Sequence, residues 1–152
     1  MTTFAPLARL DLLAHAPDVY RAMAALDKAA AEGLDRTVAE LVKIRASQLN
    51  HCAFCLDMHT RDARAAGESE QRLHLLGAWE EAGSLYTEKE RAALALTEAV
   101  TVLTDGFVPD EVYARAAEHF DEPELARLIA VITTINAWNR IAVSTRKGPA
   151  PD

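Results

Sequence analysis

The chain has 152 residues and a mass of 16.6 kDa, which suits one domain whose core needs neither disulfides nor metals to hold it together. Lys and Arg number 16 against 23 Asp and Glu, so the net charge is −7, and neither nucleic acid nor an anionic membrane is an expected partner. Half of the residues are hydrophobic and 26% are charged, a balance typical of a globular chain rather than a disordered one.

The N-terminal sequence MTTFAPLARLDLL does not resemble an export signal, because it has no basic segment and Asp11 interrupts its only apolar stretch. The longest apolar runs, such as residues 92–96 and 128–132, are too short to span a membrane. We therefore expect a cytoplasmic protein. In a reducing compartment, a close pair of cysteines indicates catalysis or metal binding rather than a structural disulfide.

Gly and Pro residues divide the chain into segments that each have a helical period, so the sequence predicts an all-α, single-domain protein. The first helix is expected to begin near Pro17, a residue favoured in a first turn, and to stop at Gly33. A second helix is predicted over residues 35–50 and a third over residues 52–66.

Capping residues predict the next three helices. Ser69 can cap a fourth helix that ends at Gly83. Thr87 and Glu90 match a capping box at the start of a fifth helix, which is rich in alanine and leucine. A short helix is then expected over residues 109–120, so the bundle has six to seven helices in total.

The last predicted helix follows a second capping box, formed by Asp121 and Glu124. Ile, Val and Thr crowd residues 129–135, which alone favours a strand, but the length of the segment and the box before it favour a helix. Because it is apolar almost all round, we expect it to be buried in the core or against another subunit. The tail, residues 147–152, is expected to fray.

Both cysteines of the chain lie in the sequence CAFC at residues 52–55, at the start of a predicted helix. The positive end of a helix dipole lowers the pKa of a nearby thiol. Two sulfurs three residues apart can form a local disulfide, whose short loop stabilises little and suits redox exchange. His59 lies one turn after Cys55, where an imidazole can generate a thiolate, and His51 precedes Cys52.

Two other interpretations of this segment stay open. Free cysteines are often buried simply as apolar residues, although such a pair has no need of polar neighbours. A zinc site would use the same side chains, namely Cys52, Cys55, His59 and His51. Structural zinc sites usually draw ligands from two separate pairs, and no second pair follows here, since His74 and His119 are isolated.

Glu40 extends the pattern, because it lies 12 residues before Cys52 and 19 before His59. A glutamate at this distance from a CxxCxxxH sequence resembles the alkylhydroperoxidase D core of the carboxymuconolactone decarboxylase superfamily. The resemblance continues through TRDARAAGESEQRL and, near the C-terminus, INAWNR, so it covers most of the chain. Thr37 with Glu40 also matches a capping box, which is the structural alternative for this glutamate, although Asp35 can cap the same helix.

The resemblance implies an alkylhydroperoxidase D-like helical bundle that assembles as a trimer or hexamer and reduces hydroperoxides without haem, flavin or another cofactor. Cys55 would attack the peroxide O–O bond and become a sulfenic acid. Cys52 would resolve it as a disulfide and would be the more exposed sulfur, which meets a lipoyl-bearing or thioredoxin-like reductant. Glu40 and His59 would form a proton relay for Cys55. Disulfide exchange with a partner protein, with little peroxidase activity, is the alternative function of the same dithiol.

The chain departs from some alkylhydroperoxidase D proteins at Phe54, where they place a relay histidine; His51 is the candidate to replace it. The true lactone decarboxylases of the superfamily generally lack the CxxC, which argues against decarboxylation here. Phe54 and Trp138 are candidates to hold the tail of an organic hydroperoxide, although core packing is the simpler role for Trp138. Arg140 either pairs with a carboxylate such as Glu40 or lies on the surface.

Overall fold

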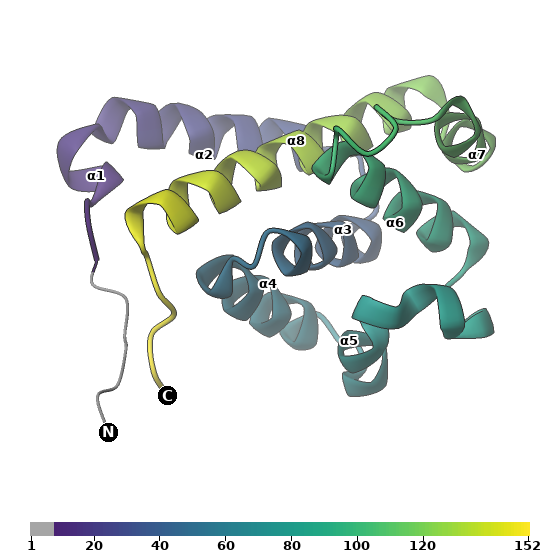
Figure 1. The fold of residues 1–152 in the computed structure, drawn as a ribbon, viewed down its shortest axis with the longest axis horizontal. Helices are drawn as coiled ribbons and strands as arrows, with labels where there is room; N and C mark the ends of the chain where they lie inside the picture. Colours follow the sequence, from purple (N-terminus) through teal and green to yellow (C-terminus); the bar gives the residue numbers. More distant parts are fainter. Residues whose placement is uncertain (1–7) are drawn as a thin grey trace.

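The computed structural model describes residues 8–152, and all regular structure in this range is helical (Figure 1). The α-helices are α1 (Leu12–His15), α2 (Pro17–Ala31), α3 (Arg36–Leu49), α4 (Ala53–Ala65), α5 (Glu70–Leu75), α6 (Glu88–Thr101), α7 (Asp110–His119) and α8 (Glu122–Thr145). Two short 3-10 segments, η1 (Leu76–Glu81) and η2 (Gly83–Leu85), connect α5 to α6. The all-α prediction is confirmed, with the four-residue α1 as an addition. Residues 1–7, the first part of the sequence judged not to be an export signal, lie outside the described residues.

Several helix ends have the predicted chemistry. Pro17 is the first residue of α2, and Gly33 follows its end with a φ of +81°, in the left-handed region that glycine adopts without strain. At the start of α6 the capping box is complete: the Glu90 N–H donates to Thr87 Oγ1 at 3.1 Å, and the Thr87 N–H donates to Glu90 Oε2 at 2.8 Å. The local sequence therefore determines where these helices begin and end.

The fourth predicted helix is wrong in its second half. The chain is α-helical only through Leu75, and Ala78 has a φ of −125° and a ψ of 34°, which interrupts the helix. The Arg91 guanidinium, which comes from α6, donates to the carbonyl oxygens of Trp79 at 3.0 Å and of Gly83 at 3.2 Å. A tertiary contact thus satisfies backbone groups that a continued helix would have bonded internally.

The second predicted capping box forms only in part. Asp121 accepts from the Glu124 N–H at 2.8 Å, as expected of an N-cap. The Glu124 carboxylate, however, accepts from Lys89 Nζ at 3.0 Å. An ion pair with α6 therefore replaces the reciprocal bond of the box.

α8 is one helix of 24 residues, as predicted, despite its β-branched stretch. The hydroxyls of Thr133, Thr134 and Thr145 each donate to the carbonyl four residues earlier, at 2.7–2.8 Å. In Figure 1, α8 runs beside α2 and over α3. No helix within residues 8–152 has both the length and the apolar character needed to cross a membrane.

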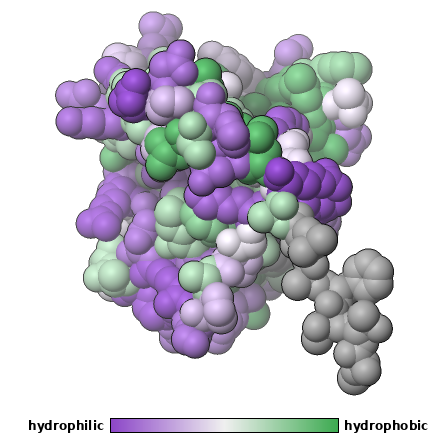
Figure 2. Space-filling view, turned by 90° about the vertical axis from the view of Figure 1, so that its left-hand side faces the viewer, coloured by the Kyte–Doolittle hydropathy of each residue, from purple (hydrophilic) through white to green (hydrophobic). Residues whose placement is uncertain are grey.

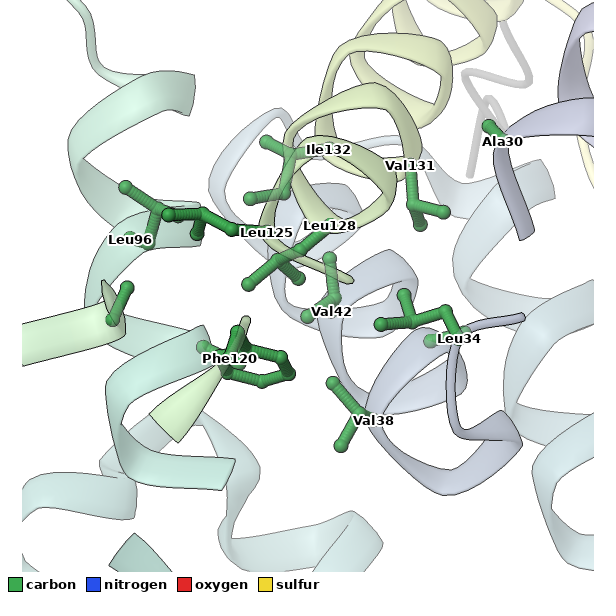
Figure 3. Packing of buried hydrophobic residues seen from close by; sticks show 13 residues of the cluster. Ala30, Leu34, Val38, Val42, Leu96, Phe120, Leu125, Leu128, Val131 and Ile132 are labelled. Atoms are coloured by element: carbon green, nitrogen blue, oxygen red, sulfur yellow. The ribbon is translucent and has the colours of Figure 1, made fainter. Parts of the chain in front are cut away.

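The core is built around α3, which packs against α4, α6 and α8. Figure 3 shows Leu128 and Ile132 of α8 next to Val42 of α3, all three 0% exposed. A second group of buried residues lies on another side of α3, where Leu41 and Ile44 contact the segment that follows α4. Because α3 is held on several sides, its polar residues have fixed positions relative to α4 and α8.

Candidate active site

The two cysteines lie where the chain turns from α3 into α4. His51 occupies this turn with a φ of +52°, and the Cys52 N–H donates to the Ser47 carbonyl at 3.0 Å. α4 begins at Ala53, so Cys52 is its N-cap and Cys55 lies in its first turn, as the sequence predicted. Both thiols are free.

Both sulfurs are buried, with Cys52 1% and Cys55 2% exposed. They pack in one cluster with Ala46 of α3 and with Ile135 and Ala142 of α8. Cys55 also lines a cavity of about 690 Å³, whereas Cys52 is not among the described residues of its wall. The expectation that Cys52 is the more exposed sulfur is therefore wrong, because the cluster with α8 encloses it and the cavity opens onto Cys55.

Only one of the two thiols ionises readily, because each cysteine shifts the pKa of the other. A hydrogen bond from the Cys55 thiol to the Cys52 sulfur outweighs burial and lowers the pKa of Cys52 to about 6. The same contact, together with burial and the neighbouring negative charge, raises the pKa of Cys55 well above that of an ordinary thiol. The pair thus holds one thiolate and one thiol near neutral pH, and transfer of one proton moves the charge between the sulfurs.

Glu40 and His59 meet beside this pair. His59 Nδ1 lies 3.4 Å from Glu40 Oε2, and neither buried atom has a hydrogen-bond partner within residues 8–152. Asp35 caps α3 by accepting from the Val38 N–H at 3.0 Å. The N-cap role thus belongs to Asp35, so the structural alternative for Glu40 does not hold and its carboxylate is available to His59.

Charge balance favours the ionised form of Glu40. Burial acts to raise the pKa of this carboxyl, but the His59 imidazole and the Lys43 ammonium, whose Nζ lies 4.0 Å from Glu40 Oε1, outweigh it and lower the pKa. His59 is 7% exposed and lines the cavity next to Cys55. A carboxylate that holds one imidazole nitrogen orients the ring for proton transfer at the other nitrogen.

The cavity has an apolar wall contributed by α1, α2, α4 and α8. Its apolar residues include Phe54, Met58, Trp138 and Ile141. The Trp138 ring packs edge-to-face against the Tyr20 ring, with 5.5 Å between the ring centres. Phe54 and Trp138 are thus both wall residues, and both also pack against the buried cluster that contains the cysteines, so Trp138 has the expected core contacts as well. Figure 2 views the molecule from the side of α1 and the C-terminal end of α8, where apolar residues lie among polar ones at the surface.

Lys147 is a cavity residue that the sequence did not indicate, because the tail was expected to fray. Arg146 ends α8 with a φ of +56°, and the Lys147 N–H then donates to the Ala142 carbonyl at 3.0 Å. This turn brings Lys147 Nζ to 4.2 Å from the centre of the Phe54 ring, a cation–π distance. Its charge acts to lower the pKa of Cys55, against the larger opposing effects of Cys52 and burial.

Buried amides from the INAWNR segment form a network under the cysteines. The Asn50 amide donates to Asn136 Oδ1 at 2.9 Å and to Asn139 Oδ1 at 3.0 Å, and Asn139 donates to Ser47 Oγ at 3.1 Å. Arg140 is exposed, as the surface alternative expected, and it donates to Asn136 Oδ1 at 2.8 Å and not to Glu40. Asparagines three residues apart in an apolar helix were the available signal, because buried amides need partners.

His51 does not join the site. It is exposed, and it is not among the described residues that line the cavity. Within residues 8–152, no three His, Cys, Asp or Glu side chains are grouped as metal ligands. The zinc alternative therefore has no ligand set in this part of the chain.

Comparison with known proteins identifies a family and relatives that this chain resembles. The profile of the carboxymuconolactone decarboxylase family matches residues 17–99. The uncharacterized protein YdfG of Bacillus subtilis is 46% identical over 130 residues, which cover 85% of this chain and 88% of YdfG. The uncharacterized protein YnjA of Escherichia coli is 34% identical over 99 residues, 65% of this chain and 53% of YnjA.

Solved structures agree with this likeness. ATU0492 of Agrobacterium tumefaciens, a protein of unknown function and a candidate antioxidant defence protein AhpD, has a TM-score of 0.92 and 36% identity over 96% of this chain and 100% of its own. An uncharacterized peroxidase-related protein of Ralstonia eutropha, described as an alkylhydroperoxidase AhpD core, has a TM-score of 0.78 and 22% identity over 91% of this chain and 74% of its own. The second likeness concerns the fold alone.

Proposed function

The chain belongs to the carboxymuconolactone decarboxylase family as an alkylhydroperoxidase D-like member, and on that premise we propose that it is a thiol-dependent peroxidase that reduces organic hydroperoxides. The observation that carries the proposal is that Cys55 and His59 line one largely apolar cavity, with Glu40 3.4 Å from the His59 ring. A nucleophile, a base and a carboxylate that orients the base are the groups that a thiol peroxidase requires.

In the first step the Cys55 proton moves to the Cys52 thiolate, and the Cys55 thiolate so formed attacks the terminal peroxide oxygen. The S–O bond forms as the O–O bond breaks, so Cys55 is oxidised to a sulfenic acid and the hydroperoxide is reduced to an alcohol. His59 donates a proton to the leaving alkoxide, and Glu40 stabilises the ring that carries it.

In the second step Cys52 passes the proton that it took from Cys55 to the leaving hydroxyl group, and its thiolate attacks the Cys55 sulfur. The S–S bond forms, and hydroxide leaves with a proton as water. The contact between the two sulfurs supports this order, because a sulfenic acid formed on Cys55 lies directly beside its resolving thiol.

The third step needs a dithiol reductant, which we propose to be a lipoyl-bearing or thioredoxin-like protein. Its thiolate attacks the Cys55 sulfur from the cavity and releases the Cys52 thiolate; its second thiol then frees Cys55 and leaves the reductant oxidised. Cys52 is the N-cap of α4, where the positive end of the helix dipole stabilises it as the leaving thiolate. An extended lipoyl arm suits the enclosed cavity better than a flat protein surface does.

We also propose that the protein is a homo-oligomer, a trimer or hexamer. The N-terminal part of the chain carries four large apolar side chains that are about half exposed, namely Leu10, Leu13, Val19 and Leu26. Leu10 and Leu13 also line the cavity. Association through this surface would bury these side chains and narrow access to Cys55, and light scattering in solution would measure the number of chains.

The test is turnover of cumene hydroperoxide with dihydrolipoamide as the electron donor. The wild type should consume peroxide continuously, and Cys55→Ser should abolish turnover. His51→Ala is the matched control, because it changes an exposed histidine next to the same motif. Wild-type rates in Cys55→Ser would refute the proposal. Catalysed reduction of a protein disulfide without peroxide turnover would instead support the disulfide-exchange alternative.

A further inference from the structure

Asn139 lies on the face of α8 that covers the two cysteines. Ile135 and Ala142, four residues before it and three after it, both pack in the cluster with Cys52 and Cys55. Residues at these spacings share one face of a helix. Asn139 is 0% exposed, so a fully buried amide lies beside the dithiol.

The hydrogen bonds of this amide leave one donor without a nitrogen or oxygen acceptor among the described residues. Asn139 Oδ1 accepts from Asn50 at 3.0 Å, and one Nδ2 hydrogen goes to Ser47 Oγ at 3.1 Å. The Ser47 hydroxyl donates its own hydrogen to the Lys43 carbonyl at 2.7 Å, so it can only accept from Asn139. The amide orientation is thereby determined, and the second Nδ2 hydrogen remains.

Ser47 connects this amide directly to the thiol pair. Its side chain accepts from Asn139, while its carbonyl accepts from the Cys52 N–H at 3.0 Å. A buried N–H with no acceptor costs free energy, and the sulfurs of Cys52 and Cys55, which the Asn139 amide contacts, can accept this hydrogen. The free hydrogen therefore has an acceptor only when it contacts a sulfur, and the contact is stronger when that sulfur is charged.

We propose that Asn139 is a catalytic residue that donates its second amide hydrogen to whichever cysteine sulfur bears the negative charge. The role rests on the proposed function, because it concerns the same dithiol cycle. The amide lowers the pKa of both cysteines, as a smaller effect than their contact with each other. It can therefore follow the charge from Cys55 during peroxide attack to Cys52 during resolution.

The other groups that act on the sulfurs are of a different kind. His59 on α4 and Lys147 in the tail contribute positive charge, and Glu40 on α3 acts through His59. These groups titrate or lie partly in solvent. Asn139 neither titrates nor reaches solvent, so its contribution should persist across pH and salt concentration.

The experiment measures thiolate formation in the reduced protein without peroxide, from the ultraviolet absorbance of the thiolate as pH rises. In Asn139→Ala the pH at the midpoint of thiolate formation should rise by about one to two units, because the charged thiolate loses one hydrogen bond. Asn136→Ala is the matched control, because it removes an amide of the same helix and network whose bonds go to Asn50, Thr101 and Arg140. Its midpoint should stay at the wild-type value.

Asn139→Leu covers the case in which the alanine variant does not fold. Leucine has the same branched four-atom side chain without the polar groups, and the partners of Asn139 keep another bond each, from Asn50 to Asn136 and from Ser47 to the Lys43 carbonyl. Its midpoint should rise as in Asn139→Ala. An unchanged midpoint in a folded variant, or an equal rise in Asn136→Ala, would overturn the role of Asn139. A wild type that forms the thiolate but consumes no peroxide would instead overturn the proposed function alone.

Discussion

Two buried ion pairs of this molecule differ in how completely their hydrogen bonds are made. Arg72 of α5 donates to Glu68 at 2.8 Å, to both oxygens of Glu90 at 2.9 and 3.0 Å, and to the Leu85 carbonyl at 2.7 Å. Glu40 and His59 approach to 3.4 Å, but Oε2 and Nδ1 form no hydrogen bond within the described residues.

The difference separates a stabilising cluster from a reactive one. Arg72 joins α5 to Leu85 and to Glu90 in the first turn of α6, and its planar guanidinium uses its donors in a fixed geometry. The second pair is not aligned as a hydrogen bond, and its histidine borders a cavity together with a thiol. Groups with unused hydrogen-bonding capacity beside a cavity can change protonation state at low cost, which catalysis requires.

Removal of the Arg72 cation should have the largest effect. Arg72→Met leaves the buried Glu90 carboxylate and the half-buried Glu68 carboxylate without their partner, which should lower the free energy of unfolding by about 3 kcal/mol. Chemical denaturation measures this loss, and peroxide turnover per folded molecule should stay at the wild-type level. Arg64→Met, which removes an exposed pair with Glu70, is the control and should cost nothing measurable. A loss of peroxide turnover in folded Arg72→Met would contradict the assignment of the Arg72 cluster to stability alone.

Changes in the Glu40–His59 pair should lower peroxide turnover and leave stability nearly unchanged. Glu40→Gln and His59→Ala should each lower peroxide turnover by about 100-fold, because they remove the relay or its orientation, with small effects on the unfolding midpoint. Glu98→Gln is the control, since its carboxylate pairs with Arg45 and Trp79 away from the cavity. Equal losses of turnover in Glu40→Gln and Glu98→Gln would mean that Glu40 acts only through stability.

Sequence patterns predicted those features that depend on neighbours within one helical turn. Pro17, Gly33 and the capping box of Thr87 with Glu90 determine helix ends through contacts a few residues long. Residues 76–83 were mispredicted because the contacts that interrupt the helix come from Arg91 on α6. A window of local sequence does not contain that partner.

The same distinction applies to the site. CxxCxxxH places Cys55 and His59 on one face of α4, and the family resemblance added Glu40, which the structure brings to His59. Asn139 and Lys147 were not predicted, since they reach the cysteines from about 90 residues away in the chain through α8 and its C-terminal turn. Their positions depend on how α8 packs, which no spacing within one helix encodes.

The hydrogen bond between the two cysteines leads to a prediction whose expected effect is of intermediate size. Cys55→Ala removes the thiol that stabilises the Cys52 thiolate, so the pKa of Cys52 should rise from about 6 toward that of an ordinary thiol. Alkylation by iodoacetamide at neutral pH should then slow by about 10-fold. An unchanged rate would mean that the Cys55 thiol does not lower the pKa of Cys52.

This ionisation also makes stability depend on pH. Because the folded pKa of Cys52 lies below that of an unfolded thiol, the thiolate stabilises the reduced protein fully near pH 9 and progressively less as pH falls through about 6. Denaturation of the reduced wild type should therefore show a loss of stability between pH 8 and about 6, and Cys55→Ala should show a smaller loss. Equal losses would assign the pH dependence to other groups.

The smallest expected effect comes from the charge at the edge of the cavity. Lys147→Met removes a cation that acts on Cys55 and contacts the Phe54 ring, but Lys147 is exposed and water screens its field. Alkylation of Cys55 in a Cys52→Ser background should slow by about threefold at low salt and less at high salt. Lys89→Met is the matched control, because Lys89 also lies over a phenylalanine, with Nζ 4.7 Å from the centre of the Phe120 ring. If Lys147→Met and Lys89→Met are alkylated at the same rate, the tail contributes packing to the site and no charge. If only Lys147→Met is alkylated more slowly, and added salt reduces the difference in rate, the Lys147 cation favours the Cys55 thiolate through space.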